Sequence, residues 1–202
     1  MVISFAAMTA WLLRLMPQYV GRHSRTYVLW AFSSITWLTV FVVATHDIEL
    51  SSFTCAAFGV ASSALGALVA IDIAVHRLPR QITYLSLALV SIFLLIGSTS
   101  LSTRTNDLLT GVILMVVMIA SLRVLSRGSL GQGDLHLAPL LGVLIGWFDP
   151  YRVLLACVVM AISGGVVVAG LMLKRQRTSS DPIAYGPFMM FGAAIAILGV
   201  RL

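Results

Sequence analysis

The chain has 202 residues, of which 59% are hydrophobic and 10% are charged, and its mean hydropathy is +1.02. Soluble domains carry about 25% charged residues, so this composition excludes an ordinary globular protein and predicts a polytopic membrane protein with one domain, residues 1–202. The formal net charge is +6, but the basic residues stand in short segments between apolar runs, which does not indicate a nucleic-acid-binding protein.

The apolar runs predict membrane spans along the chain. An α-helix rises about 1.5 Å per residue, so about 20 residues cross a bilayer. Residues 1–16 form a short first span or an interfacial segment, because Arg14 follows the apolar stretch instead of preceding it as in a signal peptide. Further spans are expected at residues 28–45, 53–73, 84–101, 108–125, 135–148, 153–173 and 186–202. We expect an all-α protein with about eight transmembrane helices, or seven if the first segment is interfacial.

The two cysteines predict no special chemistry. Cys55 and Cys157 both lie inside apolar runs, and the sequence has no CxxC pair. We interpret them as small buried hydrophobic residues, since two isolated cysteines can build neither a disulfide framework nor a zinc ribbon. The sequence gives no reason to expect a cofactor.

The basic residues also predict the orientation. They concentrate in the loops at 17–27, 74–83 and 174–185 and in the stretch before Gly131, and they are rare at 46–52, 102–107 and 149–152. Cytoplasmic loops of membrane proteins carry an excess of Lys and Arg, so the four basic segments are expected in the cytoplasm. Asp72 ends the third apolar segment on that side, and Asp134 begins the sixth on the same side.

The sixth span is short. Leu135 to Phe148 gives a helix of about 20 Å, which is less than a bilayer thickness. Either the bilayer thins locally, or residues 131–134 enter the membrane as non-helical backbone packed in protein. Gly131 and Gly133 would permit such a backbone, because they lack Cβ.

Two aspartates at one membrane face predict acid–base chemistry. An ionisable residue at bilayer depth costs about 3 kcal/mol, so it is expected to have a function or a partner. Asp134 begins a helix, where the macrodipole favours its charged form, whereas Asp72 lies among Ala, Val and Ile, where desolvation favours its neutral form. Such a pair could activate water with one carboxylate and polarise a peptide carbonyl with the other carboxyl.

Structural roles are the alternative. Aspartates at span ends often cap helices or form ion pairs, and Arg77 or Arg80 could neutralise Asp72. Metal binding would need His76 and His136 beside the two aspartates, but no zinc-binding motif is present. The remaining acids are expected in solvated loops: Asp47, Glu49, Asp107, Asp149 and Asp181.

Three motifs resemble those of one known family. Gly131-Gln132-Gly133-Asp134, followed by His136 and Leu137, resembles the GxGDxKL motif of type IV prepilin peptidases, which are intramembrane aspartyl proteases. The segment from Asp72 through Arg77-Leu78-Pro79 to Thr83 resembles the family's first aspartate segment, D…(R/L)(I/L)P…LT. Residues 184–188, followed by Gly192-Ala193, resemble its third motif, (P)(F/Y)GPFLxxGA. The resemblance covers about residues 60–202.

The resemblance implies a function and assigns roles. It implies cleavage of the leader peptide from type IV prepilins or prepilin-like proteins at the cytoplasmic face of the bacterial inner membrane. Asp72 and Asp134 would be the two catalytic residues, and Gly131 and Gly133 would shape the loop beside Asp134. Tuning of the site or contact with substrate is expected of a further set: Arg77, Pro79, His136, Gly186 and Pro187.

The chain departs from the family in two places. His136 replaces the usual Lys of GxGDxKL, and because a histidine changes charge near neutral pH, we hypothesise that it tunes the dyad or contacts substrate. Longer members carry an N-terminal cytoplasmic domain with paired cysteines and also methylate the new N-terminus. Since these 202 residues show no such domain, peptidase activity without methyltransferase activity is expected.

Two other functions are compatible with the same residues. One is a component of a proton-coupled transporter that uses both aspartates as a relay, and the other is a catalytically weakened membrane scaffold for pilus assembly. The expected partners are prepilin or pseudopilin substrates and the lipid bilayer. The sequence identifies neither the particular prepilin nor the oligomeric state.

Overall fold

The computed structural model describes residues 2–20, 24–75, 78–98, 101–125, 131–173 and 185–199. These residues form helices and contain no strand, which confirms the predicted all-α class. The helices are α1 (Val2–Val20), α2 (Ser24–Ala44), α3 (Ser52–Val75), α4 (Arg80–Ile96), α5 (Leu101–Leu125), α6 (Gln132–Phe148), the 3-10 turn η1 (Pro150–Arg152), α7 (Val153–Leu173) and α8 (Gly186–Leu198).

The helices agree with the predicted spans to within a few residues. The largest difference lies in the fifth, which begins at Leu101 rather than at residue 108. Four segments of the described chain are long and apolar enough to cross a membrane: Arg25–Ala44, Ser52–Val75, Leu101–Leu125 and Pro150–Val167. Shorter apolar helices stand beside them, so the protein is a multi-pass membrane protein.

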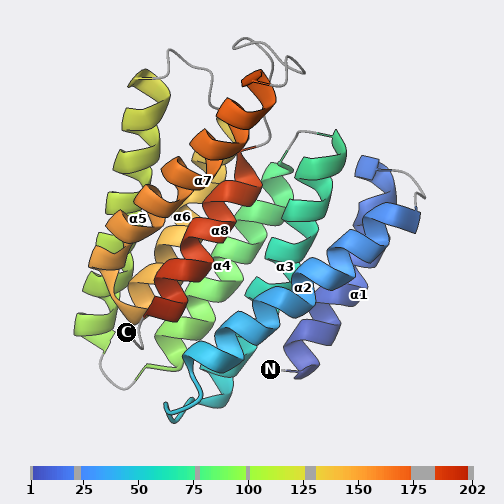
Figure 1. The fold of residues 1–202 in the computed structure, drawn as a ribbon. Coiled ribbons are helices and arrows are strands. Elements are labelled where there is room, and N and C mark those ends of the chain that lie inside the picture. The colour runs from blue at the N-terminus through green and yellow to red at the C-terminus, as the bar shows by residue number, and fades with distance from the viewer. Residues whose placement is uncertain are drawn as a thin grey trace.

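Helices α3 and α6 form the centre of the bundle. In α3, 78% of the most apolar window is buried, compared with 22% in α5. Helices α1, α2, α4 and α8 pack against α3, whereas α4, α5 and α8 pack against α6 (Figure 1). A helix that is apolar all round belongs in such an interior position.

Small residues bring α5 and α6 close together. A Cβ added to Gly142 of α6 would lie 2.7 Å from the carbonyl oxygen of Gly111 in α5. Glycines at such crossings let helix backbones approach each other, which is how membrane helices gain packing contacts without a hydrophobic driving force. The pairing of α5 with α6 therefore depends on positions that carry no side chain.

The first segment is a helix within the bundle. Leu12 and Met16 of α1 are buried, and the Thr9 and Ser63 hydroxyl oxygens are 2.8 Å apart across the contact between α1 and α3. Helix α1 packs against α3, and this contact does not decide between the two alternatives that the sequence left open, a short span and an interfacial segment.

The helices alternate in direction. The ends of α1, α3, α5 and α7 therefore meet the starts of α2, α4, α6 and α8 at one end of the bundle, at the top of Figure 1. We call this the aspartate end, because it holds Asp72 and Asp134. The other end, where α3, α5 and α7 begin, is called the opposite end.

Candidate active site

Two buried aspartates meet at the aspartate end. Asp72 lies in the last turn of α3 and Asp134 in the first turn of α6, and each is 4% exposed. Their carboxyl groups are close enough to interact electrostatically. Because both are buried to the same degree, burial does not distinguish them, which differs from the expectation that desolvation acts mainly on Asp72.

Asp134 also caps the helix that carries it. Gly131 is the N-cap residue of α6, and the Asp134 carboxylate at the third helical position accepts a hydrogen bond from the Gly131 backbone N–H. This is one half of a capping box. The prediction that residues 131–134 could enter as non-helical backbone is therefore wrong: the helix begins at Gln132, because the cap satisfies the exposed backbone donor. The 17 residues of α6 span about 25 Å.

Glycines allow neighbouring backbone to approach the aspartates. A Cβ added to Gly186, the first residue of α8, would lie 2.6 Å from the Oδ2 atom of Asp72. A Cβ added to Gly133 would lie 3.0 Å from the Cβ of Leu78, and Leu78 also lies beside Gly186. The starts of α6 and α8 and the residue before Pro79 thus enclose one site.

Pro79 and Thr83 shape the start of α4. Pro79 is the buried N-cap residue, and its carbonyl oxygen accepts hydrogen bonds from the Thr83 backbone N–H at 3.2 Å and the Thr83 hydroxyl at 3.1 Å. The proline–threonine spacing of this motif therefore has a local structural role. Arg77, for which substrate contact or tuning was expected, lies outside the described residues, as does His76.

The start of α8 places an aromatic pair near the aspartates. Pro187 stands in the first turn, where its missing N–H costs nothing. The rings of Tyr185 and Phe188 are 5.7 Å apart. Burial raises the pKa of the Tyr185 phenol above its ordinary value of 10, and the negative charge of Asp134 adds to this rise. Tyr185 is therefore close to the aspartate pair, a position that the sequence did not predict.

His136 points away from the aspartates. Its Nδ1 atom is 2.7 Å from the hydroxyl oxygen of Tyr84 in α4. Two residues along a helix correspond to a rotation of about 200°, so Asp134 and His136 occupy different faces of α6. Among the described residues, no group of three His, Cys, Asp or Glu could hold a metal ion.

Arg123 is the charged residue that sequence reasoning missed. It lies in the last turn of α5 and interacts electrostatically with Asp134. Arg123 belongs to the basic stretch before Gly131 that served only to predict orientation, although its place at the same membrane face could have indicated a partner. Arg80, which was considered as a partner of Asp72, is exposed and forms no ion pair in the described part of the chain.

Charged residues at the opposite end have ordinary surface roles. Asp149 accepts a hydrogen bond from the Tyr151 backbone N–H at 3.0 Å and pairs with Arg152 at 3.5 Å. Across the described residues, Asp72 and Asp134 are the only buried side chains that carry a formal charge. The interior therefore holds one acid pair and no charged path from one end of the bundle to the other.

Comparison with known proteins identifies the family. The model of the type IV leader peptidase family matches residues 59–165, just over half of the chain, and this match includes both aspartates. The prepilin leader peptidase/N-methyltransferases of Aeromonas hydrophila and of Aeromonas salmonicida strain A449 are each 31% identical over 137 residues, which are 66% of this chain and 46% of theirs.

The chain thus spans about half the length of the curated relatives that it matches. No solved structure matches it significantly. The predicted family is confirmed by this match, which covers the two motifs that contain the aspartates, and the chain belongs to the type IV leader peptidase family.

Proposed function

We propose that the protein is a membrane-embedded aspartyl endopeptidase that removes the leader peptide of type IV prepilins or prepilin-like proteins. The observation that carries this proposal is the pair of buried, interacting carboxyl groups of Asp72 and Asp134 inside the region that matches the family. The names of the Aeromonas relatives, which include prepilin leader peptidase, support the substrate class.

The mechanism needs one ionised and one protonated carboxyl group. The ionised carboxylate takes a proton from water as the water oxygen attacks the carbonyl carbon of the scissile peptide bond. The protonated carboxyl gives its proton to the carbonyl oxygen, which forms a tetrahedral intermediate. The intermediate collapses as the C–N bond breaks: the leaving amine receives the proton taken from water, and one hydroxyl of the intermediate returns its proton to the carboxylate that had donated one. The shared proton belongs to the pair rather than to either residue.

A proton relay is less well supported. A relay through the membrane would need polar groups along several helices, yet both buried charged side chains of the described chain lie at one end. A catalytically weakened scaffold is also disfavoured, because both aspartates stand at the end of the bundle with the glycines that admit neighbouring backbone beside them.

The proposal includes the orientation. We place the aspartate end at the cytoplasmic face of the bacterial inner membrane, because the basic segments predict that side from charge alone. A short basic leader that precedes an apolar helix would reach the aspartates from this side. Site-directed labelling of an added cysteine in the 174–185 loop of intact cells should fail with a membrane-impermeant reagent and succeed after lysis. Labelling in intact cells would reverse the orientation.

The proposal is limited to peptidase activity. The relatives' names also include N-methyltransferase, but the chain matches only 46% of their length. Purified protein incubated with a cleaved pilin and a methyl donor is expected to transfer no methyl group. A mass increase of the pilin N-terminus by one methyl group would overturn this part of the proposal without affecting the peptidase assignment.

Leader removal in cells tests the function. The chain would be co-expressed with a candidate prepilin, and the mass of the membrane-extracted pilin would show whether the leader is gone. Asp72→Asn and Asp134→Asn should abolish processing, whereas Asp149→Asn, a matched change at the other end of α6, should process normally. Processing that survives either substitution at equal expression would contradict the aspartyl mechanism.

A further inference from the structure

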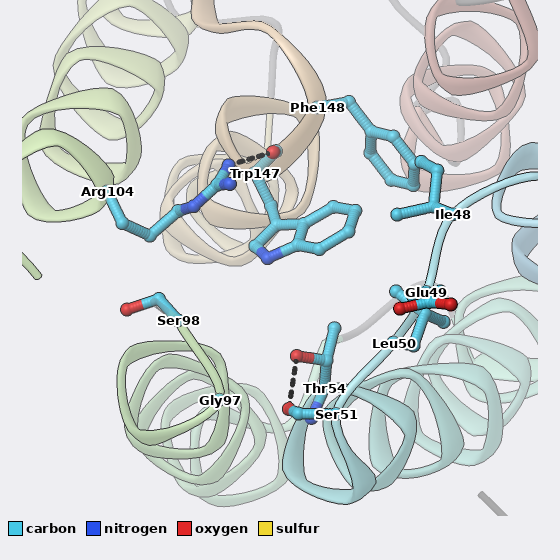
Figure 2. A pocket seen from close by; sticks show the side chains of 10 residues that line it. All are labelled: Ile48, Glu49, Leu50, Ser51, Thr54, Gly97, Ser98, Arg104, Trp147 and Phe148. Atoms are coloured by element: carbon cyan, nitrogen blue, oxygen red, sulfur yellow. Dashed lines mark hydrogen bonds between the residues drawn. The ribbon is translucent and has the colours of Figure 1, made fainter. Parts of the chain in front are cut away.

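A polar pocket lies at the opposite end of the bundle, far from the aspartates. It has a volume of about 280 Å³ and is formed by the segment before α3, the start of α3, the end of α4, the start of α5 and the end of α6 (Figure 2). Typical pockets for drug-sized ligands have volumes of about 300–1,000 Å³, so this pocket suits a smaller group. None of the residues that form the aspartate site lines it.

Arg104 places a positive charge in this pocket. Its Nη1 atom donates a hydrogen bond to the Trp147 carbonyl oxygen at 2.6 Å, and its guanidinium lies 5.1 Å from the centre of the Trp147 ring. No acidic residue of the described chain pairs with Arg104. The carbonyl and the indole hold the guanidinium in place without neutralising it, and a guanidinium has five N–H donors in a planar fork that fits phosphate.

Glu49 places a negative charge across the same pocket. Figure 2 shows Arg104 on one side and Glu49 on the other. Glu49 is exposed and pairs with no cation among the residues that the structure describes. Two opposite charges that face one pocket without meeting would both be satisfied by a ligand that carries a cation and an anion a short distance apart.

The floor of the pocket also favours an anion. Ser51, just before α3, accepts a hydrogen bond from the Thr54 backbone N–H at 3.2 Å, and the two hydroxyl oxygens are 3.0 Å apart. The start of the 24-residue α3 therefore faces the pocket with the positive end of its helix dipole. This supports the charge of Arg104 and does not by itself define a site.

An apolar groove lies between α4 and α5, close to the pocket along both helices. This second cavity of about 210 Å³ is lined mainly by residues of these two helices, among them Ser91, Leu95, Thr105 and Leu109, and also by Pro139 and Val143 of α6. Leu95 is three residues before Ser98, which lines the polar pocket, and Thr105 directly follows Arg104. A polar pocket next to an apolar groove along membrane helices has the form of a site for an amphiphile.

We propose that the pocket and groove bind a phospholipid with a zwitterionic phosphate–ammonium headgroup. The phosphate lies at Arg104, the ammonium group lies toward Glu49, and an acyl chain follows the groove between α4 and α5. A lipid is the occupant favoured over a soluble phosphoamine, because the apolar groove adds contacts that only an acyl chain can use. This inference does not depend on the proposed peptidase activity.

Lipid titration of the purified, delipidated full-length chain tests the proposal. Binding would be followed by native mass spectrometry with phosphatidylethanolamine, phosphatidylglycerol and free phosphoethanolamine. Phosphatidylethanolamine should bind at least about tenfold more tightly than either of the others, as expected for one further charged contact or for burial of an acyl chain. If phosphatidylethanolamine and phosphatidylglycerol bound with equal affinity, the proposal of a zwitterionic headgroup would be wrong. If free phosphoethanolamine bound as tightly as phosphatidylethanolamine, the proposal that the ligand is a lipid would be wrong.

Variants separate the contributions. Glu49→Gln should remove the preference for phosphatidylethanolamine over phosphatidylglycerol, whereas Asp47→Asn, a matched change in the same loop but outside the pocket, should leave it intact. Arg104→Gln should weaken binding of both lipids, and Arg104→Lys should restore part of it. Ser91→Phe should weaken binding of the lipid but not of phosphoethanolamine. Because Glu49 is exposed, its replacement by Gln should be readily tolerated. A Glu49→Gln variant that still preferred phosphatidylethanolamine over phosphatidylglycerol would contradict the proposed site.

Discussion

The two ends of the bundle differ in the exposure of their acidic side chains. At the aspartate end, Asp72 and Asp134 are 4% exposed and interact electrostatically. At the opposite end, the side chain of Asp47 is 73% exposed and that of Asp149 is 43% exposed, and each has a basic neighbour. Burying a carboxyl group is costly, and a surface carboxylate has little effect on stability. The same residue type therefore forms a buried, interacting pair at one end and an ordinary surface at the other.

The ends also differ in what surrounds the charge. Backbone approaches Asp72 at a glycine, Gly186, where a side chain would not fit. At the opposite end, side chains cap the helices: Ser51 caps α3, and Asp149 caps η1. In the proposed peptidase, a peptide substrate must lie beside the aspartates, and a lining of backbone without side chains would leave space for it.

Gly186→Ala should have the largest effect among the packing variants. The new Cβ would lie 2.6 Å from Oδ2 of Asp72, so the carboxyl group or the start of α8 must move. Because a misplacement of about 1 Å can cost about 10²-fold in rate, leader cleavage should fall by about that factor. Gly165→Ala is the control, since an added Cβ there meets no described atom within 4 Å. Equal cleavage rates in the two variants would show that Gly186 does not constrain the site.

Gly142→Ala should lower the stability of the bundle. Its Cβ would lie 2.7 Å from backbone atoms of Gly111 and Val112, which cannot rotate away. Overpacking of this kind costs about 1–3 kcal/mol, so the midpoint of thermal unfolding should fall. Gly170→Ala, where a Cβ has open space in the described structure, should leave the midpoint unchanged or raise it. A midpoint unchanged in Gly142→Ala would mean that α5 and α6 can separate without loss.

Thr83→Val tests the start of α4 beside the aspartates. The substitution removes the hydrogen bond from the buried Thr83 hydroxyl to the Pro79 carbonyl and should cost about 1 kcal/mol in unfolding free energy. Thr39→Val removes the same kind of bond at an exposed position, to the Ile35 carbonyl, and should cost less. Chemical denaturation of both variants measures the difference. An equal loss of unfolding free energy in the two variants would show that this hydrogen bond contributes no more at the aspartate end than at an exposed position.

His136→Ala should have the smallest effect. The ring pairs with Tyr84 on a face of α6 away from Asp134, so the cleavage rate should change by less than about twofold and its pH dependence should not move. Tyr84→Phe is the matched control, because it removes the hydroxyl that contacts the His136 ring. If the pH–rate profile shifts in both His136→Ala and His136→Lys but not in Tyr84→Phe, His136 acts on the dyad, as the sequence hypothesis states.

The alternation of basic and apolar segments was enough to predict the all-α class, the spans and the meeting of Asp72 with Asp134 at one end. It could not predict the helical start of α6, because this depends on the Asp134 carboxylate reaching back to Gly131. The direction of His136 also depends on α6 being helical there. These features require side-chain directions, which hydropathy does not contain.

The contacts of Leu78 and Arg123 were missed for a related reason. Leu78 lies against Gly133 and Gly186, residues far apart in sequence, and Arg123 reaches Asp134 from the end of another helix. The polar pocket beside Arg104 was missed because each of its residues, taken alone, is typical of a membrane interface. Such sites appear only when several helix ends are placed together.

The central claim is that Asp72 and Asp134 act as one catalytic unit. The direct measurement is the rate of leader cleavage by purified Asp72→Asn, Asp134→Asn and the double variant, each compared with the unmodified chain. Each single substitution should lower the rate by about 10²-fold or more, and the double variant should be no slower than the slower single variant, because residues that act together lose their function together. Losses that multiply in the double variant, or a single variant that cleaves at the original rate, would contradict the account.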